Sequence, residues 1–273
     1  MLTLTLANVL PAPIDMPAMT QGGSQWDALF WGFVASVSLL VSAVVGSRFK
    51  PGTKTVAGLL AFTAGVLIAL LSYDLIGEAF AVGGLAPSFL GMAIGLLAYI
   101  SANRWLAHMG NRDRRSCEHG GNATASTGAL ALVLGALIDG IPEAASIGIG
   151  LLETRFISVA VIAGVFIANI PEGLASGAGL SRTGFSERRI VLIWGLVTLA
   201  CTLSSWLAFV LLRESGPFVQ AALIAIAGGG ILAMTLQTVI PEAFDGTDDL
   251  ISVLGAIGFA VVFTLSHVAI HPA

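Results

Sequence analysis

Charged residues are scarce in this sequence. Only 10% of its 273 residues are Asp, Glu, Lys or Arg, whereas 56% are hydrophobic and the mean hydropathy is +0.92. Soluble domains carry about 25% charged residues, so a chain this poor in charge cannot cover a surface that faces water. It also lacks the low hydrophobicity of disordered chains. The composition therefore excludes a soluble globular protein and a disordered one.

Basic residues and cysteines are also few. A formal net charge of −4 excludes a nucleic-acid binder that works by neutralising phosphates. The two cysteines are Cys117, in a polar stretch, and Cys201, in an apolar stretch, and neither their compartment nor their spacing predicts a disulfide. The 33 glycines do not follow the three-residue period of collagen.

Long apolar runs are abundant. A helix needs about 20 apolar residues to cross a hydrocarbon core of about 30 Å, and eight stretches meet that length. The alternation that a transmembrane β-barrel requires is missing. We therefore predict an all-α integral membrane protein, with residues 1–273 forming a single transmembrane domain of eight helices. The predicted spans lie near 27–47, 55–82, 86–108, 128–151, 156–180, 188–212, 217–243 and 250–271.

Two segments fall outside these spans. Residues 1–25 have no Lys or Arg, so we predict an exposed N-terminal segment and not a signal peptide. Residues 109–127 are polar and predict a flexible loop. Ten of the 12 Lys and Arg fall on one side of the predicted topology, and only Arg155 and Arg213 fall on the other. The positive-inside rule then predicts a multi-pass protein of the cell (inner) membrane, with both termini outside and 109–127 in the cytosol.

Six acidic residues lie inside the predicted spans, where each costs a few kcal/mol. No Lys or Arg lies at a similar depth to neutralise them. They are therefore protonated, face water or bind a cation, and each alternative predicts a hydrophilic path through the bundle. These residues are Asp74, Glu78, Asp139, Glu143, Glu172 and Glu242.

A Pro-Glu pair occurs in three of the spans. Proline removes a backbone hydrogen bond and kinks a helix, and the carbonyl that it frees must meet protein, water or an ion. A bland alternative is that the prolines are tolerated kinks and the carboxylates stay protonated. Repetition of the pair without cationic partners favours an ion site. The kinks are predicted at Pro142, Pro171 and Pro241.

The residues around two of these prolines form a candidate central site. Asp139 and Glu143 are four residues apart, and Asn169 and Glu172 are three apart, so each pair shares a helical face. At about 1.5 Å per residue, the acidic residues spread over most of the membrane thickness. This spread predicts an entry, a central site and an exit. The path residues outside the central site are Asp74 and Glu78 near the outer end, and Gln237, Thr238 and Glu242 towards the cytosol.

At these motifs the sequence resembles the ZIP (Zrt/Irt-like) family of divalent metal transporters, over roughly residues 27–271. Span four of that family usually reads His-Asn-x-Pro-Glu-Gly; here Asp139 replaces the His and Gly140 replaces the Asn. The resemblance implies a divergent, bacterial-type member that lacks the usual histidine ligands. It also implies an elevator-like movement of the helix bundle that contains spans four and five. The implied ligands of a single metal site are Asp139, Glu143, Asn169 and Glu172.

We therefore expect a secondary transporter with a divalent metal ion as its substrate, and neither a cofactor nor an enzymatic activity. The resemblance implies Zn²⁺ or Fe²⁺, whereas oxygen ligands favour Mn²⁺, Mg²⁺ or Ca²⁺. A homodimer is left open. One alternative keeps the scaffold but carries protons or another cationic substrate, with the metal site lost. Another is an intramembrane metalloenzyme, although no H-E-x-x-H or G-x-S-x-G motif occurs.

Overall fold

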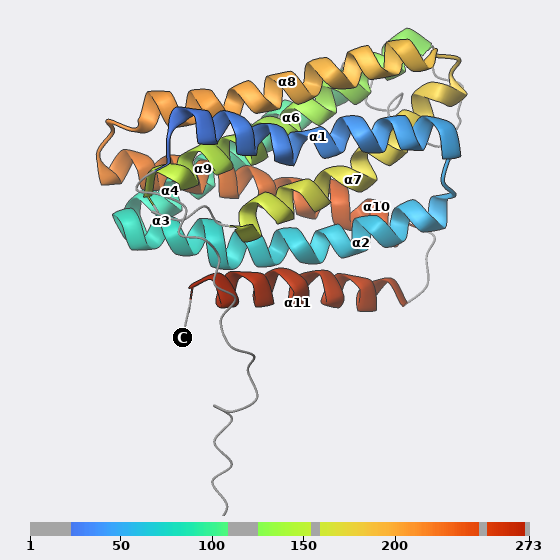
Figure 1. Ribbon diagram of the computed structural model, residues 1–273. Helices are drawn as coiled ribbons and strands as arrows, with labels where there is room; N and C mark the ends of the chain where they lie inside the picture. Colours follow the sequence, from blue (N-terminus) through green and yellow to red (C-terminus); the bar gives the residue numbers. More distant parts are fainter. Residues whose placement is uncertain (1–22, 109–124, 154–158, 246–249, 271–273) are drawn as a thin grey trace, which may run out of the picture.

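The computed structural model describes residues 23–108, 125–153, 159–245 and 250–270. Every element within these residues is helical, and the long helices run side by side (Figure 1). Seven of them are long and apolar enough to cross a membrane, and the apolar stretch Ile251–His267 of the last helix is shorter. The predicted all-helical bundle of a multi-pass membrane protein is confirmed.

The helices follow the predicted spans closely. Residues 1–22 and 109–124, which make up most of the predicted N-terminal segment and loop, lie outside the described residues. The end of the predicted loop, 125–127, is the first turn of a helix. Six spans are single helices: α1 (Gln25–Phe49), α4 (Leu85–His108), α6 (Ala125–Glu153), α7 (Val159–Arg182), α8 (Glu187–Leu212) and α11 (Leu250–Ile270).

Two spans contain a short π-helical segment. The second span consists of α2 (Thr53–Ala69), η2 (Leu70–Leu75) and α3 (Ile76–Gly83). The seventh consists of α9 (Pro217–Met234), η3 (Thr235–Val239) and α10 (Ile240–Phe244). Single π turns inside α-helices are rare and occur frequently at functional sites. Both segments contain residues of the predicted path.

Proline accounts for the position of η3. Pro241 has no N–H, so the carbonyl of Gln237 cannot accept the usual bond from it. One residue earlier, the N–H of Ile240 bonds to the carbonyl oxygen of Thr235, which is the five-residue step of a π turn. Pro142 and Pro171 lie inside α6 and α7, and both helices continue through them. The kinks predicted at the three prolines stay predictions.

The helices form two groups. The first helix group, α1, α6, α7 and α8, packs around α1, and Figure 1 shows α1 in front of α6, with α8 on one side and α7 on the other. The second helix group contains the second span, α4, the seventh span and α11. The second and seventh spans face α7 and α6 of the first group.

Glycines set how closely the helices approach one another. A Cβ added at Gly177 of α7 would lie 2.0 Å from the backbone oxygen of Ala43 in α1. Likewise, a Cβ at Gly229 of α9 would lie 2.1 Å from the backbone oxygen of Met92 in α4. Between the groups, a Cβ at Gly164 would meet the side chain of Leu70 at 3.4 Å. At these positions the helices of one group touch through backbone, whereas the two groups touch through side chains.

Candidate functional site

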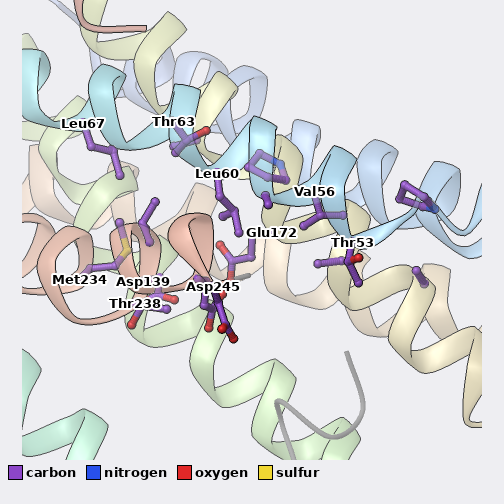
Figure 2. A pocket seen from close by; sticks show the side chains of 18 of the residues that line it. Thr53, Val56, Leu60, Thr63, Leu67, Asp139, Glu172, Met234, Thr238 and Asp245 are labelled. Carbon is purple, nitrogen blue, oxygen red and sulfur yellow. The ribbon is translucent and has the colours of Figure 1, made fainter. Parts of the chain in front are cut away.

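A cavity of about 180 Å³ lies between the two helix groups. Figure 2 shows α2 residues, from Thr53 at one end to Leu67 at the other, in a row along one side. Asp139 of the first group lies opposite that row, next to Thr238 of η3, whereas Glu172 of the first group lies closer to Leu60. The apolar wall and the clustered acidic groups make the cavity the strongest candidate site among the described residues.

The cavity contains most of the predicted site. Its wall includes the central carboxylates and two of the predicted residues of the seventh span, Thr238 and Glu242. Six predicted residues are not in the wall: Asp74, Glu78, Gln237, Asn169, Pro142 and Pro241. The predicted residues that line the cavity are Asp139, Glu143, Pro171, Glu172, Thr238 and Glu242.

Asp139 is held by a tyrosine from the other helix group. Its side chain is buried on α6, and the hydroxyl of Tyr99 on α4 donates to Asp139 Oδ1 at 2.9 Å. The same hydroxyl lies 3.3 Å from Oγ1 of Thr238 on η3. Tyr99 itself is buried. One phenol therefore contacts a predicted metal ligand and a predicted path residue.

Glu143 and Glu172 occupy equivalent places on α6 and α7. Each follows a proline, and the backbone carbonyl of each accepts a hydrogen bond of 2.6 Å from a serine one turn later, Ser146 and Ser176 respectively. The carboxylates of Glu172 and Asp139 lie near enough to that of Glu143 to interact with it electrostatically. Three acidic groups from two helices therefore share one low-dielectric space, where a cation would be stabilised.

This arrangement is not a finished metal centre. Over the described ranges, no group of three or more His, Cys, Asp and Glu side chains could hold a metal ion. Cys201 of α8 is buried, but it completes no such group. A divalent ion bound by all the predicted ligands would therefore require their side chains to move closer together.

Asn169, a predicted metal ligand, is not in the cavity wall but is bonded to α1. It is buried on α7, and its side-chain N–H donates to the backbone oxygen of Ala35 on α1 at 3.2 Å. The Ser42 hydroxyl donates to the backbone oxygen of Asn169 at 3.4 Å. Oδ1 of Asn169 is buried and makes no hydrogen bond to the described residues. A buried amide oxygen without a donor is available to a cation.

Three predicted path residues lie elsewhere. Asp74 is buried and accepts a hydrogen bond of 2.7 Å from the hydroxyl of Ser266 on α11. It lies about 10 Å beyond Leu67 along its span, at the usual rise per residue. Glu78 lies one turn further, and exposed Gln237 accepts from the side-chain N–H of Asn103 at 3.2 Å. The continuous path predicted from Asp74 to Glu242 is therefore not brought together in this cavity.

Sequence reasoning missed several residues at the site, among them Tyr99, which contacts two wall residues, Asp139 and Thr238, without being in the wall itself. Tyr99 is one of only two tyrosines in the chain, and that rarity inside an apolar run was the only available signal. Thr63 of α2 lines the cavity, and its buried hydroxyl makes no hydrogen bond to the described residues. Lys54 and Arg182 also line it, so basic groups do reach the wall. Both sit on exposed helix ends, at the mouth of the cavity.

The mouth lies at one end of the bundle. Its wall includes Pro51, in the connection between α1 and α2, and exposed Asp245, which follows α10. An ion pair between Arg48 at the end of α1 and Glu187 at the start of α8 lies at that end of the first group.

The chain matches no model of a protein family and no curated protein.

Proposed function

We propose that this protein is a secondary transporter that moves divalent metal cations of the Zn, Fe or Mn class across the plasma membrane. The observation that carries this proposal is the cavity that Asp139, Glu143 and Glu172 line between two groups of apolar helices. Carboxylates at such depth are costly unless they serve an ion or proton pathway. The ZIP-like Pro-Glu motifs support a metal ion as the cargo.

The shape of the cavity supports a carrier and not an open channel. It reaches the surface at the end that contains Lys54 and Arg182, and its far end is lined by Leu67 and Met234. Asp74 lies beyond this apolar end. Alternating access requires a central site that reaches one side at a time. By the positive-inside rule, the mouth faces the cytosol.

The packing of the bundle supports movement between its two groups. The helices of each group meet backbone to backbone at glycines such as Gly177 and Gly229, and such contacts resist separation. The contact between Gly164 and Leu70 of the other group involves a side chain at ordinary distance. A sliding movement of the first group, which the ZIP resemblance implies, would leave both groups internally intact.

A second candidate function keeps the scaffold and changes the cargo. In the described part of the chain, no three His, Cys, Asp or Glu side chains already form a metal-holding group. A carrier of protons or of a small organic cation would need only the negative cavity, not a coordination shell. The two proposals differ in whether a divalent metal binds and competes for the carboxylates.

The test is transport by purified protein in liposomes. We expect the wild type to take up Zn²⁺ and Mn²⁺, and Glu143→Gln and Glu172→Gln to lose this uptake while eluting as folded protein, because each removes a charged oxygen at nearly constant volume. Glu214→Gln is the matched control, because Glu214 is exposed and pairs with Arg213 on the surface. Unimpaired uptake by both cavity variants would refute the site. A wild type that moves protons or amines but no metal would establish the second candidate.

A further inference from the structure

Tyr99 joins the two helix groups at the candidate site. It belongs to α4 of the second group, and it donates at 2.9 Å to Asp139 on α6 of the first group. Its contact of 3.3 Å with Thr238 stays within the second group. The hydroxyl therefore lies between a predicted metal ligand on one group and the π segment of the other.

Two hydrogen bonds near the site, both between described residues, connect helices of the same group. Asn103 bonds to Gln237, and both belong to the second group. Asn169 bonds to Ala35, and both belong to the first. These bonds can persist when the groups move relative to one another. The Tyr99–Asp139 bond cannot, because its donor and acceptor lie on different groups.

The position of Asp139 is the second observation. Asp139, Glu143 and Glu172 share the cavity, yet within the described ranges they form no group able to hold a metal. Oδ1 of Asp139 is directed to Tyr99, on the side of α4 and η3. A divalent cation shared by the three carboxylates would need Asp139 oxygens turned towards Glu143 and Glu172. Turning them would stretch or break the bond to Tyr99.

We propose that Tyr99 is a positioning residue whose hydroxyl holds Asp139 out of the coordination group, so that cation binding and the bond between the helix groups compete for the same carboxylate. This inference rests on the proposed transport function. Tyr99 acts on the cation through Asp139 and does not ligate it. Binding of the cation then releases one connection between the two groups, which couples occupancy of the site to their relative movement.

The proposal predicts the sign of a mutational effect. Removing a hydrogen bond that exists only before the cation binds favours the bound state. Tyr99→Phe should therefore lower the Kd for Zn²⁺ by roughly tenfold, the ratio expected from one charge-assisted hydrogen bond. A tyrosine that merely oriented Asp139 for binding would give the opposite result, a raised Kd.

A matched control is available because the chain has two tyrosines. Tyr73 lies on η2, is 39% exposed, and contacts the rings of Phe259, Phe263 and His267 of α11. It is not in the cavity wall. Tyr73→Phe removes the same atom from the same residue type, and we expect it to leave the Kd for Zn²⁺ unchanged.

The hydrogen bond can be observed directly. Protein labelled with carbon-13 at the ring carbon Cζ of tyrosine should give two resonances in detergent, and Tyr73→Phe should leave only that of Tyr99. We expect the Tyr99 resonance to move in Asp139→Asn, and to move again when Zn²⁺ or Ca²⁺, both diamagnetic, saturates the wild type. Binding is measured separately by equilibrium dialysis.

Each outcome has one meaning. No change of the Tyr99 resonance in Asp139→Asn would overturn the bond itself. Saturation of the wild type with Zn²⁺ or Ca²⁺ without any movement of the resonance, or a raised Kd in Tyr99→Phe, would overturn the competition. A wild type that binds no divalent cation in dialysis would overturn the proposed function and this inference together. The dialysis result identifies that case, because the Asp139→Asn comparison needs no cation.

Discussion

The side chain of Asn169 is tied to the backbone of Ala35. Its N–H donates to the Ala35 carbonyl oxygen at 3.2 Å, and both residues are buried. This bond fixes which way the amide faces, because nitrogen is directed to α1 and Oδ1 is turned elsewhere. A predicted metal ligand therefore also connects α7 to α1 inside the first helix group.

Asn169→Asp should be more harmful than its added charge suggests. The carboxylate would place an oxygen against the Ala35 carbonyl, so a hydrogen bond is replaced by repulsion between two acceptors. We expect a loss of about 1–3 kcal/mol in the free energy of unfolding, the usual cost of an unsatisfied buried group. The measurement is unfolding in detergent together with Zn²⁺ uptake. Asn103→Asp is the control, since its partner Gln237 is exposed and can turn to donate. Equal stability of the two variants would refute the anchoring role.

Asp139→His should change the selectivity of transport. An imidazole nitrogen favours Zn²⁺, whereas a carboxylate accepts harder ions such as Mn²⁺ as well. We expect the Zn²⁺/Mn²⁺ uptake ratio to rise in the variant when liposomes are offered equal concentrations of the two ions. Asp245→His is a useful comparison, because Asp245 is exposed at the mouth of the cavity. A ratio unaffected by Asp139→His would mean that residue 139 does not touch the metal.

Gly177→Ala should destabilise the first helix group. The new Cβ would lie 2.0 Å from the Ala43 backbone oxygen, so α1 and α7 would have to separate. Overpacking of this kind costs about 1–3 kcal/mol and sometimes more. Gly195→Ala on α8 is the control, because a Cβ there has no neighbour within 4 Å, and alanine favours helix. Melting temperatures in detergent should fall for the first variant and hold or rise for the second; any other order contradicts the packing.

The orientation can be tested with single cysteines in a background in which Cys117 and Cys201 are alanine. Ser186→Cys, in the connection between α7 and α8, should react with an impermeant maleimide only after the cells are opened. Glu214→Cys, between α8 and α9, should react on intact cells. These results follow from the excess of basic residues at the cavity end. The reverse pattern would place the cavity mouth outside.

The spans could be predicted from the sequence because bilayer thickness fixes their length and apolarity. The seventh span was expected near 217–243, and the helical segments cover 217–244. Helix ends were harder, since a helix can continue past the apolar stretch. The fourth span was expected to begin near residue 128, but α6 begins at Ala125. Hydropathy describes the hydrocarbon part and not the cap.

The central site could be predicted in part. Asp139, Glu143 and Glu172 were singled out by their depth, and the structure brings them into one cavity. Depth, however, does not give the direction in which a residue faces. Asp74 has a suitable residue type, yet its partner is Ser266 of α11. Tyr99 could not be paired with Asp139, because that contact depends on how α4 packs against α6.

The π segment η3 shifts the angular phase of everything that follows it in the seventh span. A π turn takes in one residue more than an α turn, and one residue corresponds to about 100° around a helix axis. Glu242 and Asp245 follow this segment and line the cavity. Without the additional residue, the acidic side of α10 would be rotated by that angle, and a different set of side chains would face the cavity. The one additional residue in the π turn therefore determines which side of α10 faces the cavity.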